Sequence, residues 1–263
     1  MADEPSLISP SNLETQDIIE SEENKNEIAE EYAGILDTEM KNLLEKMLES
    51  GVHYGRKKTV THPKMKPFML KTKKDIEVFN LLRTKEGLER MVDFMQKLLQ
   101  EKKTILFVGT RPGSKEPIKI LAQELSQPYV TERWLGGILT NFKTIKERLN
   151  YFKELKGKKE TGEFAKYPIK DRQEFEKDLI RLEKEMGGII GLERLPHALF
   201  VVDLPTHKTA VREARKLGIP IMAVCGSDNN PEEADICIPA NDKASASVAL
   251  LLDYLRGKLA VAK

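Results

Sequence analysis

Cysteine and histidine are scarce in this chain of 263 residues, which contains two cysteines and four histidines. Cys225 and Cys237 cannot build a disulfide framework, and both lie in apolar runs that are typical of small buried residues in a reducing compartment. The chain has no CxxC pair and its histidines are scattered, which argues against a structural zinc site. We therefore predict no metal site.

Long apolar runs are also absent. No stretch approaches about 18 consecutive apolar residues, the length that a membrane-spanning helix needs. The N-terminal region is acidic and has no apolar core segment, so it resembles neither a secretory signal nor an arginine-rich transit peptide. These observations predict a cytoplasmic protein that does not act at a membrane.

The charges are distributed unevenly, although the net charge is only +1. Residues 1–40 contain twelve acidic residues and a single base, Lys25, which leaves 30 acids and 42 bases in the rest of the chain. The near-neutral isoelectric point is thus an average over two unlike regions and carries no information about partners. A segment as polar and acidic as residues 1–38 cannot bury enough apolar surface to fold alone, so we predict a disordered extension.

Apolar strands alternate with amphipathic helices over much of the remaining chain. This alternation is typical of a parallel sheet covered by helices on both faces, and we predict an α/β domain from residues 39–140 and 189–263. A helix is predicted after Thr84 as N-cap. The predicted strands are Asp75–Asn80, Thr104–Val108, Pro128–Thr131, Leu199–Val202, Pro220–Val224 and Asp235–Ile238.

The interval 141–188 interrupts this alternation. Apolar residues step by three and four in two segments, which is coiled-coil spacing, and two glycines and a proline lie between the segments. We predict an antiparallel helical hairpin inserted into the α/β domain. Two short helices are marginally stable alone, so a partner at the hairpin is expected.

Residues 56–74, the basic segment, contain eight bases and no acid. The segment has no clear period and contains two prolines, so it is predicted as a loop in which many side chains are free to face outward. A polyanion is its natural partner, because phosphates attract the cations and released counterions drive binding. A lysine-rich loop that is merely solvated has the same composition, and the segment alone does not separate the two interpretations. Its candidate RNA-binding residues are Arg56, Lys57, Lys58, His62, Lys64, Lys66, Lys71 and Lys73.

A second cluster, residues 133–141, contains the only tryptophan and a pair of glycines. The glycines permit a sharp turn, and we interpret Trp134 as the anchor of a packed turn. Thr140 or Asn141 could cap the first helix of the hairpin. Arg133 and Lys143 are further candidates for contact with phosphate.

An enzyme on the same fold would use the carboxyl ends of the parallel strands, where open α/β sheets bind ligands. Gly109–Ser114 resembles a phosphate-binding loop but matches neither GxGxxG nor GxxxxGK[ST]. Asp203 and His207 could form an acid–base pair, and Ser114 or Ser227 could be a nucleophile, yet no GxSxG motif supports a triad. We favour capping and bracing roles for Asp203, Thr206 and Asp228, and predict no catalysis and no cofactor.

Three blocks of the sequence, in this order, resemble a known family. They are GVHYGRKKTVTHPKMKPFM from Gly51, RWLGGILTNFKTI from Arg133, and a long block from Leu195 that includes IPAND. Together they resemble the bacterial-type family of the second protein of the small ribosomal subunit, over roughly residues 40–257.

The resemblance implies a flavodoxin-like doubly wound α/β domain with an inserted coiled-coil hairpin, and a structural role without catalysis. It implies binding to small-subunit ribosomal RNA between the head and body of the subunit, and contact with neighbouring proteins, including the large messenger-RNA-binding one. The RNA-contacting positions that it carries over are Arg56, Lys57, Lys58, Lys64 and Lys66, with His62 in the same block.

The sequence departs from the family pattern at several positions. Tyr54-Gly55-Arg56-Lys57 replaces the usual HFGHQ, which keeps positive charge but not a specific histidine contact. Gly226-Ser227-Asp228 replaces the usual DTN, and Asn80 replaces an aspartate. The acidic extension 1–38 has no counterpart in the typical member, so its role is open.

Overall fold

The computed structural model describes residues 38–260. The predicted disordered extension therefore lies almost wholly outside the described residues. Contacts between Cα atoms divide the chain into two units, residues 1–50 and residues 51–263. In the first unit, helix α2 spans Thr38–Glu49.

The core of the second unit is a parallel sheet of five strands in the order β5-β4-β6-β7-β8. Numbered along the chain, this order is 2-1-3-4-5, which is the order of flavodoxin-like doubly wound sheets. The order agrees with the fold that the resemblance implies, and the prediction of a parallel sheet is confirmed. The strands are β4 (Ile105–Val108), β5 (Tyr129–Val130), β6 (Ala198–Val202), β7 (Ile221–Cys225) and β8 (Ile236–Pro239).

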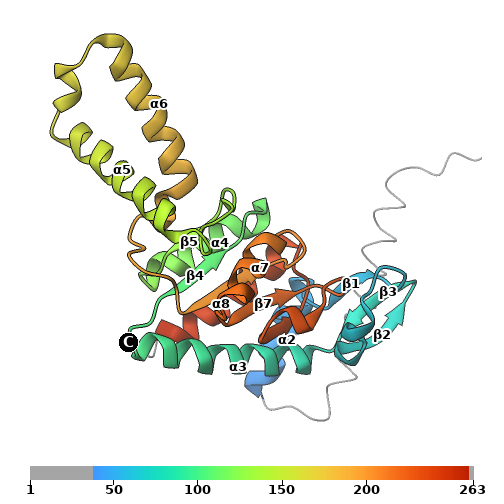
Figure 1. Cartoon of the computed structure of the whole chain (residues 1–263). Coiled ribbons are helices and arrows are strands. Elements are labelled where there is room, and N and C mark those ends of the chain that lie inside the picture. Colours follow the sequence, from blue (N-terminus) through green and yellow to red (C-terminus); the bar gives the residue numbers. More distant parts are fainter. Residues whose placement is uncertain (1–37, 261–263) are drawn as a thin grey trace, which may run out of the picture. The chain divides into compact units, whose positions relative to one another are not determined.

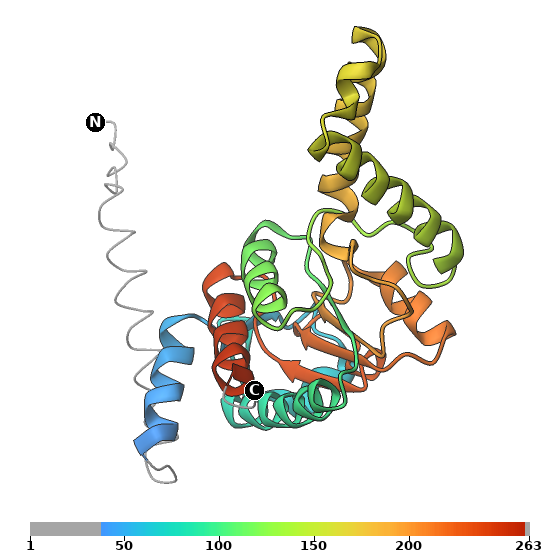
Figure 2. The same cartoon turned by 90° about the vertical axis from the view of Figure 1, so that its left-hand side faces the viewer.

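The central strands form because their side chains are apolar on both faces. Every residue of β4, β6 and β7 is buried, so each strand contributes to the core on both sides of the sheet. Helices α4 and α8 cover one face and pack closely on each other, while α7 covers the other face (Figure 2). The long helix α3 packs along β8 and α8. These helices are α3 (Leu81–Gln100), α4 (Pro112–Glu124), α7 (Lys208–Lys216) and α8 (Ser245–Ala260).

The start of α3 differs from its prediction. Asn80, and not Thr84, is the N-cap, and its side-chain oxygen accepts a hydrogen bond from the backbone N–H of Leu82 at 3.0 Å. Thr84 lies inside the helix, where its buried hydroxyl donates to the Pro239 carbonyl at 2.6 Å. Both residue types cap helices well, so local preference alone did not separate them.

The basic segment folds differently from the predicted loop. It forms most of an antiparallel sheet in the order β1-β3-β2, with a 3₁₀ turn, η1, between β1 and β2 (Figure 1). The strand predicted at Asp75–Asn80 is confirmed as β3. The prediction missed β1 and β2 because their side chains alternate only weakly between buried and exposed. The elements are β1 (Tyr54–Lys57), η1 (Pro63–Phe68), β2 (Met69–Lys73) and β3 (Ile76–Phe79).

Residues 142–186 form two consecutive helices, α5 (Phe142–Glu160) and α6 (Ile169–Met186), which pack on each other and project outward from the region of β5 (Figure 1). Ile145, Leu149 and Phe152 of α5 are buried in the same apolar cluster as Leu179 and Leu182 of α6. Short 3₁₀ turns follow each helix, η2 (Glu163–Lys166) and η3 (Gly187–Ile189). The coiled-coil character of this helix pair stays a prediction.

Within residues 38–260, every helix is too short or too polar to cross a lipid bilayer.

Candidate nucleic-acid interface

The antiparallel sheet gives the basic segment a defined backbone. Strands β2 and β3 are joined by Lys74 and Asp75, whose φ angles are +46° and +63°. Two consecutive positive φ values are typical of a type I′ turn, the tight turn that best suits the twist of a hairpin. Strand β1 pairs with β3 in antiparallel register, with Tyr54 opposite Val78. The cations of the segment are therefore carried on a folded platform.

Four lysines of this platform, Lys57, Lys58, Lys64 and Lys66, are exposed. The buried side chain of Met65 holds η1 against the body and leaves the lysines on either side of it exposed. Lys64 forms an ion pair with Glu232, but both side chains are about half exposed or more, so the pair contributes little stability. An incoming phosphate can therefore replace Glu232 as a partner of Lys64.

The other predicted residues of the segment are less exposed. Lys71 and Lys73 lie in β2 and are half-buried. The half-buried ring of His62 caps η1, because its Nδ1 accepts a hydrogen bond from the backbone N–H of Lys64 at 3.2 Å. The main-chain N–H of His62 donates to the Ser227 carbonyl at 2.8 Å. His62 thus shapes η1 and joins it to the loop after β7.

Arg56 differs from the lysines, because its guanidinium is held by carboxylates of the body. Its Nε lies 3.0 Å from Oδ1 of Asp228, and a terminal nitrogen donates to Oδ1 of Asp242 at 2.8 Å. Its main-chain N–H donates to the Ser227 hydroxyl at 2.7 Å. The structure therefore departs here from the expectation that the bases face outward: Arg56 anchors the small sheet to the carboxyl ends of β7 and β8.

The anchoring carboxylate of Asp242 lies in an unusual environment. Its pKa is raised to about 6, because burial and the nearby carboxylates of Asp203 and Asp228 raise it by more than Arg56 and Asn229 lower it. Gly226 makes this close arrangement possible, because a Cβ at that position would lie 2.5 Å from Oδ1 of Asp242. Arg56 is thus the cation that compensates a crowded group of acids.

Both residues of the second predicted patch are exposed: Arg133 lies on the loop that α7 holds in place, and Lys143 lies in the first turn of α5. Trp134 donates through its indole N–H to Glu213 of α7 at 3.1 Å, which agrees with its interpretation as an anchor. Asn141 is the N-cap residue of α5, but its side chain accepts from the Thr144 hydroxyl and not from a backbone N–H. The loop is therefore ordered mainly by contacts with α7.

Glu213 is the residue of this region that sequence reasoning missed. Its buried carboxylate accepts five hydrogen bonds at 2.8–3.1 Å. Burial raises its pKa, but these hydrogen bonds outweigh burial and the net pKa is lowered. A signal was available, because Glu213 is a lone acid beside Ala210 and Ala214 on an apolar helix face, and a buried carboxylate needs donors. The donors are the indole of Trp134, the backbone of Gly137 and Leu139, and both the backbone and the hydroxyl of Thr140.

The switch point of the parallel sheet lies between β4 and β6, where a doubly wound fold would bind a ligand. Asp203 and His207 do lie there, but their polar groups are used by the protein itself. The carboxylate of Asp203 accepts from the backbone and hydroxyl of Thr206 and pairs with Arg111. Nε2 of His207 lies 3.1 Å from the hydroxyl of Thr110, and its Nδ1 lies 2.9 Å from the Asp203 carbonyl. These contacts connect the two strand ends to each other.

The other candidate catalytic residues are engaged in similar ways. The Ser114 hydroxyl donates to the Arg111 carbonyl at 3.1 Å, inside the first turn of α4. The Ser227 hydroxyl accepts the backbone N–H of Arg56. Burial raises the pKa of the Cys225 thiol well above its usual value, so the reactive thiolate is disfavoured. The hydroxyls of Ser114 and Ser227 are thus both engaged in hydrogen bonds with the backbone.

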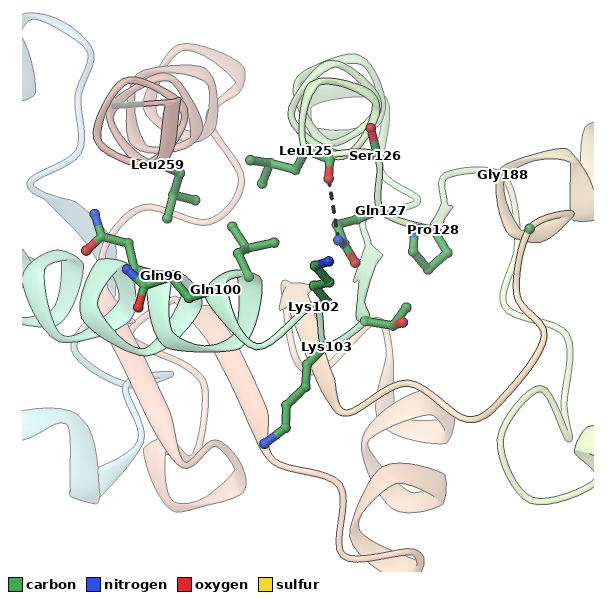
Figure 3. A pocket seen from close by; sticks show the side chains of 13 residues that line it. Gln96, Gln100, Lys102, Lys103, Leu125, Ser126, Gln127, Pro128, Gly188 and Leu259 are labelled. Atoms are coloured by element: carbon green, nitrogen blue, oxygen red, sulfur yellow. Dashed lines mark hydrogen bonds between the residues drawn. The ribbon is translucent and has the colours of Figure 1, made fainter. Parts of the chain in front are cut away.

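A cavity of about 650 Å³ lies at the opposite edge of the sheet (Figure 3). Thr104 and Pro128, which line it, directly precede β4 and β5, so the cavity is at the amino ends of the strands. Gln96, Gln100 and Gln127 also face it, together with the exposed Lys102 (Figure 3). It is therefore remote from Asp203 and His207.

Comparisons with known proteins match most of the chain. The family model described as ribosomal protein S2 matches residues 47–260. The small ribosomal subunit protein uS2 of Coprothermobacter proteolyticus is 39% identical over 208 residues, which cover 79% of this chain and 78% of that protein. The match to the family model extends over the parallel sheet and the antiparallel sheet together.

Proposed function

Because the chain belongs to the ribosomal protein S2 family and is a structural constituent of the small ribosomal subunit, we propose that its basic segment binds small-subunit ribosomal RNA. The observation that carries this proposal is the exposure of Lys57, Lys58, Lys64 and Lys66 on one folded platform. Cations that are fixed in place and solvated can replace counterions of an RNA backbone, and the released counterions favour binding.

The remaining predicted residues either supply additional cations or hold the basic segment in position. Lys71 and Lys73 lie at the edge of the platform, and two further cations lie apart from it, Arg133 on the loop before α5 and Lys143 in α5 itself. His62 and Arg56 act mainly by positioning, because the first caps η1 and the second anchors β1. The exposed lysines should therefore dominate the electrostatic part of the affinity.

The test uses the full chain with Lys57, Lys58, Lys64 and Lys66 all changed to glutamate. All four side chains are exposed, so the variant should keep its thermal midpoint within about 2–3 °C. Its affinity for a small-subunit ribosomal RNA transcript should fall at least about 100-fold at moderate salt, and the log–log slope of affinity against salt should become less negative by about 3. Incorporation into small subunits should fall with the affinity.

The matched control changes the same four lysines to arginine, which keeps the charges. This control should bind RNA and enter subunits normally. Normal incorporation of the glutamate variant, with its fold intact, would reject the basic segment as the RNA-binding site.

We also propose that the protein has no catalytic activity. The support is that Asp203, His207 and Ser227 are engaged in contacts that hold strand ends together. A panel of nucleotides and sugar phosphates should leave the thermal midpoint unchanged. A saturable rise with one of them would instead support a ligand site on the sheet.

The hairpin formed by α5 and α6 is proposed to contact a neighbouring small-subunit protein. Ile169 and Ile180 of α6 are 73% and 67% exposed, and Tyr151 of α5 is also exposed. Ile169 and Ile180 are eleven residues apart, which places them on one face of the helix. Changing both to glutamine should preserve RNA affinity and weaken retention of a neighbouring protein in purified subunits. Unchanged protein composition of the subunits would contradict this contact.

For the chain as a whole we propose a cytoplasmic ribosomal protein built from three parts. These are a flavodoxin-like α/β domain, the hairpin insertion at residues 141–188, and the acidic extension at residues 1–38. The opposite charges of the extension and the basic segment suggest that the extension shields the lysines before assembly. Removal of residues 1–38 should then increase binding to unrelated RNA, and unchanged binding would reject shielding.

A further inference from the structure

The outer face of α7 carries a stripe of bases that the basic segment does not include. Lys208, Arg212, Arg215 and Lys216 are all exposed, and they follow the spacing i, i+4, i+7 and i+8 that lines one face of a helix. The opposite face is formed by buried Ala210, Val211 and Ala214. The helix therefore presents a basic face to solvent and an apolar face to the sheet.

No acid on α7 compensates this charge. The single acidic residue of the helix, Glu213, is turned inward and engaged in five hydrogen bonds. Within residues 38–260, no carboxylate lies within ion-pair distance of Lys208, Arg212 or Lys216. Arg215 donates to the main-chain carbonyl of Glu232, which leaves other N–H groups of its guanidinium available.

The orientation of the stripe is fixed by the contacts of the inner face. Glu213 holds residues 134–140, and Ala210 and Ala214 belong to the apolar cluster that includes Ile221 of β7. The helix cannot rotate its bases inward without breaking these contacts. A phosphate ligand would therefore meet cations that are already positioned, which reduces the entropy lost on binding.

Helix α7 also connects the two basic patches. On one side, Glu213 holds the loop that carries Arg133. On the other side, Arg215 contacts Glu232, which is also the ion-pair partner of Lys64 in η1. Figure 1 shows α7 between the small antiparallel sheet and the base of α5. The stripe thus fills the interval between two groups of cations.

We infer that the basic face of α7 is a second RNA-binding surface, continuous with the basic segment, which binds the phosphate backbone of the same RNA. This inference rests on the proposed function. From Lys208 to Lys216 the helix rises about 12 Å, so its four cations are spread over a length that can meet more than one phosphate of an RNA backbone. Arg212 and Arg215 can each engage a phosphate through two N–H groups, and Lys208 and Lys216 supply point charges.

The test changes Lys208, Arg212 and Lys216 together to glutamine in the full chain. Binding to a small-subunit ribosomal RNA transcript is then measured at several salt concentrations. Loss of three phosphate contacts should make the log–log slope less negative by about 2–3 and weaken binding at least about 10-fold at moderate salt. A control variant with Arg90, Lys97 and Lys119 changed to glutamine removes equal charge from α3 and α4 and should keep the wild-type slope.

Two further sets of variants keep the result interpretable, one that conserves the charges and one that changes a single residue at a time. Changing Lys208 and Lys216 to arginine keeps the charges and should retain full affinity. If the glutamine variant unfolds at the assay temperature, the three single glutamine variants replace it, each with an expected slope change of about 0.7–0.9.

The outcomes separate this inference from the proposed function. A wild-type slope for the α7 variant, together with weak binding by the glutamate variant of the basic segment, would overturn the α7 surface alone. Wild-type slopes for both variants would overturn both. Normal RNA binding with loss of a small-subunit protein from purified subunits would make α7 a protein-binding surface and would also overturn the inference.

Discussion

Charged residues serve opposite purposes in two neighbouring regions of this protein. At the carboxyl ends of the parallel strands, Arg56 pairs with the buried Asp242 and Arg111 pairs with the buried Asp203. His207 contacts the hydroxyl of Thr110 at the same edge of the sheet. In the basic segment, Lys57, Lys58 and Lys66 face solvent. The first region stabilises the fold, and the second is available to a polyanion.

The difference shows that charge alone does not identify a binding residue. Arg56 and Lys57 are adjacent in the chain and both are basic, yet the side chain of Arg56 is only 21% exposed and contacts two carboxylates. A binding role requires that the charged group be available without breaking an internal ion pair. Substitutions that act on buried and exposed charges should therefore separate stability from RNA affinity.

The largest effect is expected for a buried charge, Glu213→Ala. The substitution removes one carboxylate that satisfies five donors of the 134–140 loop, and unsatisfied buried donors are costly. We expect the free energy of unfolding to fall by about 3–4 kcal/mol at pH 7, as measured by urea denaturation.

The effect of Glu213→Ala should also depend on pH. The folded state lowers the pKa of Glu213 below the ordinary value of 4.5, so its stabilising contribution is present above that value and is lost as the pH falls through the folded pKa. The difference between wild type and variant should therefore shrink below about pH 4. A difference that stays constant down to pH 3 would contradict this role.

A smaller effect is expected for Arg56→Ala. The substitution leaves the buried carboxylate of Asp242 without its cation, which should reduce the free energy of unfolding by about 2–3 kcal/mol at pH 7.5. Its control is Arg56→Lys, which keeps the charge but cannot contact Asp228 and Asp242 through a planar fork. The free energy of unfolding of this control should lie between those of the wild type and Arg56→Ala.

The pH dependence of Arg56→Ala has the opposite origin to that of Glu213. The folded pKa of Asp242, about 6, is raised above its ordinary value of 3.8, so this group reduces stability as the pH rises from about 4 to 6. Loss of Arg56 raises that pKa further. At pH 5 the carboxyl is largely neutral with or without Arg56, and the destabilisation should be clearly smaller than at pH 7.5. An equal loss in the free energy of unfolding at both pH values would contradict the pairing of Arg56 with Asp242.

The smallest effect on stability is expected for Lys57→Gln. The side chain is exposed and belongs to no buried network, so the free energy of unfolding should change by less than about 0.5 kcal/mol. The slope of RNA affinity against salt should nevertheless change by about 0.7–0.9. A stability loss comparable with that of Arg56→Ala would remove the distinction between the two residues.

Much of the α/β architecture was predictable because strands that are buried on both faces are continuous apolar runs. Val108 and Val202 end such runs, and β4 and β6 do pair in parallel. The amphipathic spacing of α3 and α7 was equally visible. The strands of the basic segment were not, because YGRK and MLKTK are polar and half-buried.

The division of the basic residues into anchors and exposed cations was not predictable from local sequence. The partners of Arg56 lie more than 170 residues away in the chain, at Ser227 and Asp242. Only the parallel sheet brings these positions together. The stripe on α7 was visible in KTAVREARK, but its location between two other patches depends on contacts made by Glu213 and Arg215.

The central claim, that exposed lysines of the basic segment contact ribosomal RNA, can be tested directly by acetylating lysines in assembled small subunits and in the free protein. Lys57, Lys58, Lys64 and Lys66 should react readily in the free protein and slowly in subunits, and limited ribonuclease digestion should restore their reactivity. Equal reactivity in both states, with these ammonium groups open to reagent on the intact subunit, would contradict the account.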